Sequence, residues 1–378
     1  MSLTSEAIAL TQTLVRMDTV NPPGNEDQCT VHLSRLLEQA GFTCRFVEFG
    51  PRRSTLVARI GGQASKAALG FTGHVDVVPL GAAPWAHDPF GAEIVEGRMY
   101  GRGTSDMKSG VAAFVVAAVA LAGRIKSGPG LTLIITAGEE TGCEGAFHLV
   151  QQPDAQAILG QVGALVVGEP TSNQPLVGHK GVLWLEASAA GVTAHGSMPD
   201  QGDNAIYKIA RAISSLETFE FEEGPHPLMG KPTLNVGTVR GGLNINSVPD
   251  AAEVKIDIRT VAGQDHGHVY SCLCGRLGKD LRFKTLIDAA SVYTPPDDPW
   301  MRQVFAVCQK HFEEPLQPKT VSYFTDAAAL LGPLGNPPTV ILGPGEPQMA
   351  HQTNEYCEVS RIEEAVTIYH ELIEAWCC

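Results

Sequence analysis

The 378-residue chain has few basic residues, no CxxC pair and no apolar run long enough to cross a membrane. Lys and Arg number 27 against 41 Asp and Glu, which gives a formal net charge of −14. This acidity argues against nucleic acid or an anionic membrane surface as the partner. The longest apolar stretch, residues 111–122, is too short for a bilayer, so we expect a buried helix there.

The cysteines also limit the possibilities. There are nine, an odd number, and they are scattered along the chain. They are typical of reduced thiols in a cytoplasmic protein. The first residues lack the basic segment followed by an apolar run that marks a signal peptide. We therefore expect a cytoplasmic location.

Residues 1–179 and 294–378 show the alternation of helices and strands that is typical of an α/β domain. We predict helices at 5–17, 27–40, 110–124, 300–311 and 361–376, and strands at 46–49, 56–60, 67–72, 131–137, 164–167 and 339–342. The pattern favours a mostly parallel sheet with helices on both faces. Ligands bind beyond the carboxyl ends of such strands, which is where His74, Glu139 and Glu169 lie.

Residues 180–293 follow a different order. We predict strands at 181–189, 233–239, 251–259 and 281–287, and helices at 204–216 and 265–277. This β-α-β-β-α-β order is the ferredoxin-like arrangement. A proline-rich linker follows it. We therefore predict a discontinuous catalytic domain of residues 1–179 and 294–378, interrupted by an inserted lid or dimerisation domain of residues 180–293.

Several potential metal ligands lie beside strand ends or glycine turns. A lone histidine is more often structural, but His74 has Asp76 two residues away, and metal-binding imidazoles usually donate their second N–H to a carboxylate. Asp106 lies in a glycine-rich turn before a helix. In that position its carboxylate could simply be stabilised by the dipole of the helix. A phosphate-binding loop is a further alternative, but the turn lacks the spacing that such a loop requires. A carboxylate fixed on such a turn can bridge two metals.

The adjacent pair Glu139 and Glu140 follows a buried strand and is flanked by glycines. Two neighbouring carboxylates repel each other unless cations neutralise them, although an exposed strand end could also carry them. Adjacent side chains point in different directions, so one can bind a metal while the other acts as a general base on the water.

A charge count supports a two-metal centre. Two neutral histidines, His74 and His351, with the carboxylates of Asp106, Glu140 and Glu169 supply three negative charges against four from two divalent cations. The remaining charge suits one hydroxide and leaves Glu139 uncoordinated. A nitrogen and oxygen donor set without cysteine fits catalytic zinc, and cobalt or manganese are alternatives.

These motifs closely resemble the di-zinc amidase family that includes acetylornithine deacetylase, succinyl-diaminopimelate desuccinylase, aminoacylase and glutamate carboxypeptidase. The matching segments are residues 72–79 (TGHVDVVP), 103–108 (GTSDMK), 138–142 (GEETG), 168–171 (GEPT), 194–199 (AHGSMP) and 350–355 (AHQTNE). Each is weak alone, but their order along nearly the whole chain is specific.

The resemblance implies roles for these residues. One zinc ion is expected to be held by His74 and Glu169, and the other by Glu140 and His351. Asp106 is expected to bridge the two ions. Glu139 would deprotonate the bridging water and pass the proton to the leaving amine, and Asp76 would orient His74. The peptide between Asp106 and Met107 is expected to be cis.

Three residues of the inserted domain are candidates for contacts with the substrate. By resemblance, His195 polarises the scissile carbonyl as part of an oxyanion hole, in many cases from the partner subunit of a dimer. Arg259 and Asn246 match positions that bind the α-carboxylate of the substrate. Each has an alternative role. His195 could be a turn histidine whose ring faces solvent, Arg259 could form an ion pair at a strand end, and Asn246 could be a turn residue.

The sequence thus predicts a metal-dependent amidohydrolase that cleaves an N-acyl-L-amino acid by means of a bridging metal hydroxide. The segments 168–172 and 343–345 are most similar to acetylornithine deacetylase, and a desuccinylase, aminoacylase or carboxypeptidase is the alternative. A non-catalytic protein that binds metal or amino acids is a hypothesis of another class. The expected partners are a small N-acylated amino acid or dipeptide and a second copy of the chain, joined through the inserted domain.

Overall fold

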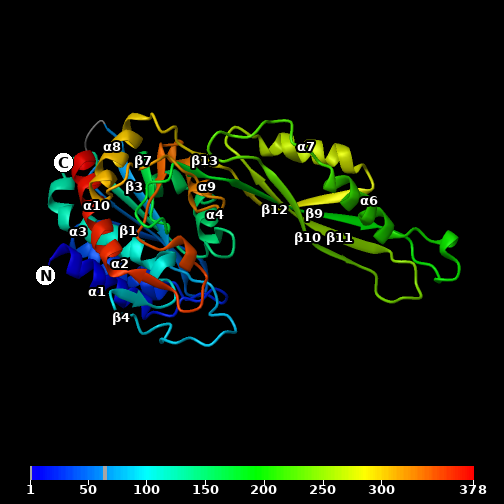
Figure 1. The fold of residues 1–378 in the computed structure, drawn as a ribbon, viewed down its shortest axis with the longest axis horizontal. Helices are drawn as coiled ribbons and strands as arrows, with labels where there is room; N and C mark the ends of the chain where they lie inside the picture. Colours follow the sequence, from blue (N-terminus) through cyan, green and yellow to red (C-terminus); the bar gives the residue numbers. More distant parts are fainter. Residues whose placement is uncertain (1, 63–65) are drawn as a thin grey trace. The chain divides into compact units, whose positions relative to one another are not determined.

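The computed structural model describes residues 2–62 and 66–378, and the chain forms two compact units. The first unit consists of the residues up to Gly178, 293–319 and 325–378, and the second of 179–292 with 320–324 (Figure 1). The sequence analysis placed all of 294–378 in the first unit. The segment 320–324 differs because Val321 forms a β-bridge with His179 and accepts a hydrogen bond from the Lys180 N–H at 3.1 Å.

The first unit contains a six-stranded sheet in the order β1-β2-β6-β3-β7-β14. Its strands are β1 (Thr43–Gly50), β2 (Arg53–Ile60), β3 (Ala68–His74), β6 (Leu131–Thr136), β7 (Val162–Val167) and β14 (Thr339–Ile341). The strands β6, β3, β7 and β14 are parallel to one another. Strand β2 is antiparallel to both of its neighbours, β1 and β6. The predicted mostly parallel sheet is thus confirmed, and β1 and β2 are antiparallel because only Pro51 and Arg52 connect them, which is too short for a crossover.

Helices cover both faces of this sheet. The ring of Phe71 in β3 has its centroid 5.6 Å from that of Phe114 and 5.3 Å from that of Tyr369. On the opposite face, Thr136 bonds to Asp326, which directly precedes α9. The helices are α1 (Leu3–Val15), α2 (Asp27–Gln39), α3 (Ser109–Ile125), α4 (Glu144–Val150), α5 (Ala155–Leu159), α8 (Pro299–Cys308), α9 (Ala327–Leu334) and α10 (Val359–Cys377).

Short elements complete the first unit. Strands β4 (Glu93–Val95), β5 (Arg98–Tyr100) and β15 (Tyr356–Glu358) form a small antiparallel sheet. The pair β8 (Gly178–His179) and β13 (Val292–Tyr293) lies where the chain passes from one unit to the other. Neither α4, α5 nor α9 was predicted, because glycines and Pro333 interrupt the apolar pattern around them.

Among the described residues, one segment, 104–125, is long and apolar enough to cross a membrane. It includes α3, and 78% of its most apolar stretch is buried inside the protein. The central part of α3, including Val111, Phe114 and Val115, is fully buried. The segment is therefore a core helix of the first unit, as the sequence predicted for residues 111–122.

The second unit is a four-stranded antiparallel sheet with two helices, in the strand order β10-β11-β9-β12. Its elements are β9 (Gly181–Ala190), α6 (Ala205–Glu217), β10 (Thr233–Gly241), β11 (Ala251–Thr260), α7 (His266–Leu277) and β12 (Leu281–Ala289). Alternate residues of β9, such as Leu183, Leu185 and Ala187, pack with Ile209 of α6 and Leu273 of α7 into one core. The chain order is thus β-α-β-β-α-β.

Candidate active site

His74 is the last residue of β3 and lies at the carboxyl end of the parallel strands. Its Nδ1 is 2.9 Å from the carbonyl oxygen of Asp76, and its Nε2 is 3.2 Å from Oδ1 of Asp106. Burial alone would lower the pKa of His74, but its contacts with Asp106 and Asp76 raise that pKa well above the ordinary value. Nδ1 is therefore occupied, and Nε2 faces the carboxylates, as a metal ligand requires.

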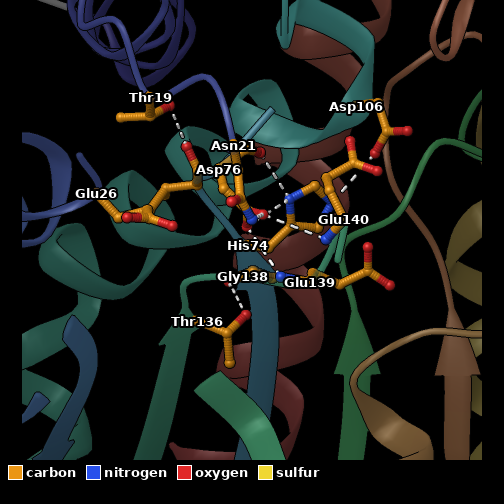
Figure 2. Close-up of polar contacts among 12 residues, drawn as sticks. Thr19, Asn21, Glu26, His74, Asp76, Asp106, Thr136, Gly138, Glu139 and Glu140 are labelled. Atoms are coloured by element: carbon orange, nitrogen blue, oxygen red, sulfur yellow. Dashed lines mark hydrogen bonds and ion pairs between the residues drawn. The ribbon is translucent and has the colours of Figure 1, made fainter. Parts of the chain in front are cut away.

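Asp76 holds more of the site than the predicted contact with His74. The Asp76 carboxylate is 3.6 Å from Nδ1 of His74, whereas the Asp76 carbonyl oxygen is 2.9 Å from the same atom. The carboxylate instead accepts hydrogen bonds from the main-chain N–H groups of Glu139 and Glu140 at 3.1 and 3.2 Å, and from the Asn21 amide at 2.9 Å. Figure 2 shows Asp76 and Asn21 on one side of the His74 ring and Asp106 on the other. Asp76 thus fixes His74 and the Glu139–Glu140 turn together.

Asp106 lies in the turn Thr104–Lys108 before α3, and its peptide bond to Met107 is cis, as the resemblance implied. Its two oxygens face different histidines: Oδ1 is 3.2 Å from Nε2 of His74, and Oδ2 is 3.4 Å from Nε2 of His351. Contacts with His351 and His74 outweigh burial and lower the pKa of Asp106. This geometry is what a carboxylate shared by two cations requires.

Glu139 and Glu140 lie in the turn between β6 and α4. The Glu139 carbonyl accepts hydrogen bonds from the N–H groups of Gly142 and Cys143, both at 2.9 Å, which closes the turn. Oε2 of Glu140 is 3.0 Å from Nε2 of His351. Burial raises the pKa of Glu139 well above its ordinary value, and the Cys143 thiol lies 3.8 Å from its Oε1. The side chains of Glu139 and Glu140 therefore point in different directions, the first toward Cys143 and the second toward His351.

The remaining predicted ligands come from distant segments. Glu169 follows β7, is 5% exposed, and places Oε1 3.8 Å from Nε2 of His74. His351 lies in the loop before β15, and its contacts with Asp106 and Glu140 raise its pKa to about 10. All five predicted ligands therefore lie in one group at the carboxyl edge of the sheet.

The donor set fits bound cations. Ligand atoms of His74, Asp106 and Glu140 all lie within 4.8 Å of one another. Oε1 of Glu140 is buried and makes no hydrogen bond, which is costly unless another group satisfies it. Burial raises the pKa of Glu140 and Glu169, so these crowded carboxylates lack the positive charge that would keep them ionised. Divalent cations would supply it.

Metal binding should release at least one proton per chain at neutral pH. His351 has a pKa of about 10 and His74 also has a raised pKa, so both imidazoles carry protons that a metal must displace. Affinity should therefore rise with pH. Zinc titration calorimetry in two buffers of different ionisation enthalpy measures the number of protons.

The variant His351→Ala should lower that number. The matched control is His87→Ala, because His87 pairs with Glu93 in an exposed ion pair outside the group of ligands. Zinc affinity that stayed constant between about pH 6 and 8, where a histidine of ordinary pKa titrates, would contradict the assignment of these imidazoles as ligands.

The three candidate residues of the second unit lie on its strands and loops. His195 is exposed, with Nδ1 2.7 Å from the Ser197 hydroxyl. It pairs with Ser247 in a β-bridge, and the Asn246 carbonyl accepts the Gly196 N–H at 2.8 Å. His195 and Asn246 are thus in neighbouring segments.

Arg259 forms the ion pair that the sequence analysis gave as its alternative role. Its Nε and Nη2 donate to the two carboxylate oxygens of Asp257 at 2.9 and 3.1 Å. The indole N–H of Trp184 donates to the same carboxylate at 2.8 Å. Arg259 is therefore held by Asp257, and a substrate carboxylate would have to use its remaining N–H groups or replace Asp257.

Sequence analysis missed residues that hold the ligands in place. Glu355 is fully buried, and its carboxylate accepts hydrogen bonds from the N–H groups of Gly103, Ser105 and Asp106 at 2.8–3.0 Å. It also pairs with Arg102 at 2.6 Å. Its only signal was its place at the end of the 350–355 motif. Asp326, whose pKa burial raises to about 6, gave no signal at all.

The sequence matches the family described as "Peptidase family M20/M25/M40" over residues 70–375. It is 32% identical over 385 residues to succinyl-diaminopimelate desuccinylase 1 of Ruegeria sp. (strain TM1040), with 98% of each chain covered. It is 29% identical over 363 residues to acetylornithine deacetylase of Vibrio campbellii, which covers 92% of this chain and 90% of that one.

Solved structures share the fold. The M20 family metallo-carboxypeptidase Sso-CP2 from Sulfolobus solfataricus superposes with a TM-score of 0.77 at 18% identity, covering 98% of this chain and 99% of that one. The YXEP protein of Bacillus subtilis, described as a dinuclear metal binding peptidase, has a TM-score of 0.69 at 15% identity and covers 100% and 99%. At these identities the likeness shows a mixed α/β fold with a largely parallel sheet.

Proposed function

The chain belongs to peptidase family M20/M25/M40 and is a hydrolytic metalloenzyme that acts on amide bonds, and we propose that it removes the acyl group of a small N-acyl-L-amino acid. Relatives named for an N-succinyl and an N-acetyl substrate match nearly the whole chain. Deacetylation of an acetylornithine-like substrate and desuccinylation of a diaminopimelate derivative are therefore equally supported. A carboxypeptidase or aminoacylase activity is the alternative.

The observation that supports the proposal most is the position of Asp106 between His74 and His351. In the proposal, His74 and Glu169 hold one cation, Glu140 and His351 the other, and Asp106 both. Zinc is the proposed metal, because the donors are imidazole and carboxylate. Two such ions, when bound, lower the pKa of a water molecule and polarise the substrate carbonyl.

Glu139 is the proposed general base and acid. Its carboxylate is next to the ligands but makes none of their contacts, and burial raises its pKa, which brings it closer to the pH at which it must accept a proton. It would take a proton from the attacking water and give it to the leaving amine nitrogen. Asp76 serves as a positioning residue, because it holds the Glu139 main chain.

We propose that the second unit serves as a lid and supplies the groups that bind the rest of the substrate. His195 would donate to the oxyanion of the tetrahedral intermediate, which its exposed ring permits. Arg259 and Asn246 would bind the α-carboxylate. Because Asp257 already holds the Nε and Nη2 groups of Arg259, the substrate carboxylate would bind the remaining N–H groups of Arg259 or take the place of Asp257.

We also propose that the enzyme is a cytoplasmic homodimer formed through the second unit. β10 is an edge strand, so its outer N–H and C=O groups can pair with another chain. Next to it, Leu243 and Ile245 are 98% and 102% exposed. The free state of all nine cysteines supports the cytoplasmic location. Light scattering that gave a monomer mass at micromolar concentration would rule out the dimer.

A substrate panel tests the activity. We expect zinc-loaded protein to cleave an N-acetyl- or N-succinyl-amino acid with kcat/KM at least about 100-fold above any dipeptide, since a deacylase is tuned to one acyl group. Faster cleavage of dipeptides or C-terminal residues would favour the peptidase alternative. Stoichiometric zinc without hydrolysis of any amide would favour the non-catalytic metal or amino-acid binding protein.

A further inference from the structure

A second group of metal-binding side chains lies in the second unit, apart from the ligands of the first. Nε2 of His268 is 3.0 Å from Oε2 of Glu222, and Sγ of Cys272 is 3.6 Å from Nε2 of His268 and 3.9 Å from Oε1 of Glu222. The three ligand atoms lie within 4.8 Å of one another. Imidazole, thiolate and carboxylate are all donors that zinc accepts.

The local fold explains why these side chains meet. His268 and Cys272 are four residues apart on α7, so both lie on one face of the helix. Asp265 caps this helix by accepting the His268 N–H at 3.0 Å, which fixes the first turn. Glu222 lies in the segment between α6 and β10. In this segment the rings of Phe219 and Phe221 pack against the core of the second unit. The third donor is thereby held over the helix.

The separation of the thiol and the imidazole matches that of a zinc site. Zinc–sulfur bonds of ~2.3 Å and zinc–nitrogen bonds of ~2.0–2.1 Å place the two ligand atoms ~3.6 Å apart at a tetrahedral angle. The distance between Sγ of Cys272 and Nε2 of His268 is 3.6 Å. The i, i+4 positions on α7 bring the thiol and the imidazole together, and the resulting separation is one that a shared zinc ion can use.

The surroundings are acidic and open. A cavity with a volume of about 270 Å³ lies beside the three residues, and Glu220 and Glu223 line it with them. Arg276 also lines it, but its guanidinium donates to the Ser215 and Thr218 carbonyls at 3.0 Å. The guanidinium keeps its charge there, but the three carboxylates of Glu220, Glu222 and Glu223 outnumber it, so the surroundings of Cys272 stay net negative.

We propose that Glu222, His268 and Cys272 form a second, independent site for one thiophilic divalent cation, zinc in the first instance, with water in the fourth position. Binding would replace the proton of the Cys272 thiol and any proton on His268, both of which pass to the buffer. The bound ion would join the segment 219–223 to α7. This site goes beyond the proposed amidase function and does not depend on it.

Cobalt substitution distinguishes this site from the catalytic one. The ligands assigned to the catalytic centre are His, Asp and Glu, so a thiolate-to-cobalt charge-transfer band would report on Cys272. We expect metal-depleted full-length protein to show this band on titration with Co²⁺, and Cys272→Ser to lose it. The matched control is Cys274→Ser, two residues along the same helix, which should keep the band.

Zinc content gives a second measurement. Wild-type protein and Cys274→Ser should each hold one more zinc ion per chain than Cys272→Ser after equilibrium dialysis. His268→Gln should lose the same ion, which guards against a folding defect of one variant. Absence of the band, or a band and zinc content unchanged in Cys272→Ser, would overturn the proposal and leave only an ion pair between His268 and Glu222.

Discussion

Replacing Glu139 by Gln should reduce kcat by roughly 10²- to 10⁴-fold, the range by which general acid–base catalysis contributes, while the zinc content stays that of the wild type. The amide keeps the size of the side chain but cannot accept a proton from water. Steady-state kinetics and elemental analysis of the same preparation measure the two effects. Glu139→Ala should behave in the same way.

The structure explains why the loss of activity should not be accompanied by a loss of metal. The contacts that join the ligands run between Asp106 and the two histidines and from His351 to Glu140, and none of them uses the Glu139 carboxylate. Glu139 enters the turn through its main chain, whose N–H donates to Asp76 at 3.1 Å. A change of its side chain therefore leaves the main-chain hydrogen bond and the ligand geometry in place.

A nearby glutamate serves as the control. Glu144 begins α4, and its half-exposed carboxylate pairs with Arg53 at 3.0 Å. Glu144→Gln changes the same charge in the same segment without touching the ligands, so kcat should stay close to that of the wild type. If Glu139→Gln kept activity within about tenfold, or lost zinc together with activity, the general base would have to be another group.

The sequence predicted the grouping of the proposed ligands better than it predicted the residues that hold them in place. His74 ends an apolar strand, and Glu140 and Glu169 come shortly after two others, so the rule that parallel strands end at one edge was enough to group them. Antiparallel β1 and β2 could have been anticipated, since Gly50 and Pro51 are a turn signal between two strands.

The supporting residues could not be predicted, because their partners are far away in the chain. Glu355 bonds to main-chain groups about 250 positions earlier, from Gly103 to Asp106. A glutamate at the end of a polar loop has no local pattern that indicates complete burial. Asp326 likewise accepts a hydrogen bond from Thr136, which lies 190 positions earlier. Such contacts depend on tertiary packing that short-range patterns do not contain.

Removal of this hidden support should be costly: Glu355→Ala is expected to destabilise the first unit by ~3–5 kcal/mol, the cost of breaking a buried ion pair from one side. The Arg102 guanidinium, 2% exposed, would lose its carboxylate partner, and three main-chain N–H groups would lose their acceptor. One of these belongs to Asp106, so zinc affinity should fall as well. Urea unfolding followed by circular dichroism, with zinc titration, measures both effects.

The strand β15, which directly follows Glu355, provides the matched control for Glu355→Ala. Glu358 lies three residues farther on, and its pair with Arg98 at 2.9 Å has side chains that are 32% and 45% exposed. Because exposed pairs contribute at most about 1 kcal/mol, Glu358→Ala should shift the unfolding midpoint little and leave zinc affinity unchanged. Equal effects of the two variants would show that the Glu355 carboxylate does not hold the Asp106 turn. A larger loss in Glu355→Ala alone would place the stability of the metal centre in a carboxylate that does not itself bind the metal.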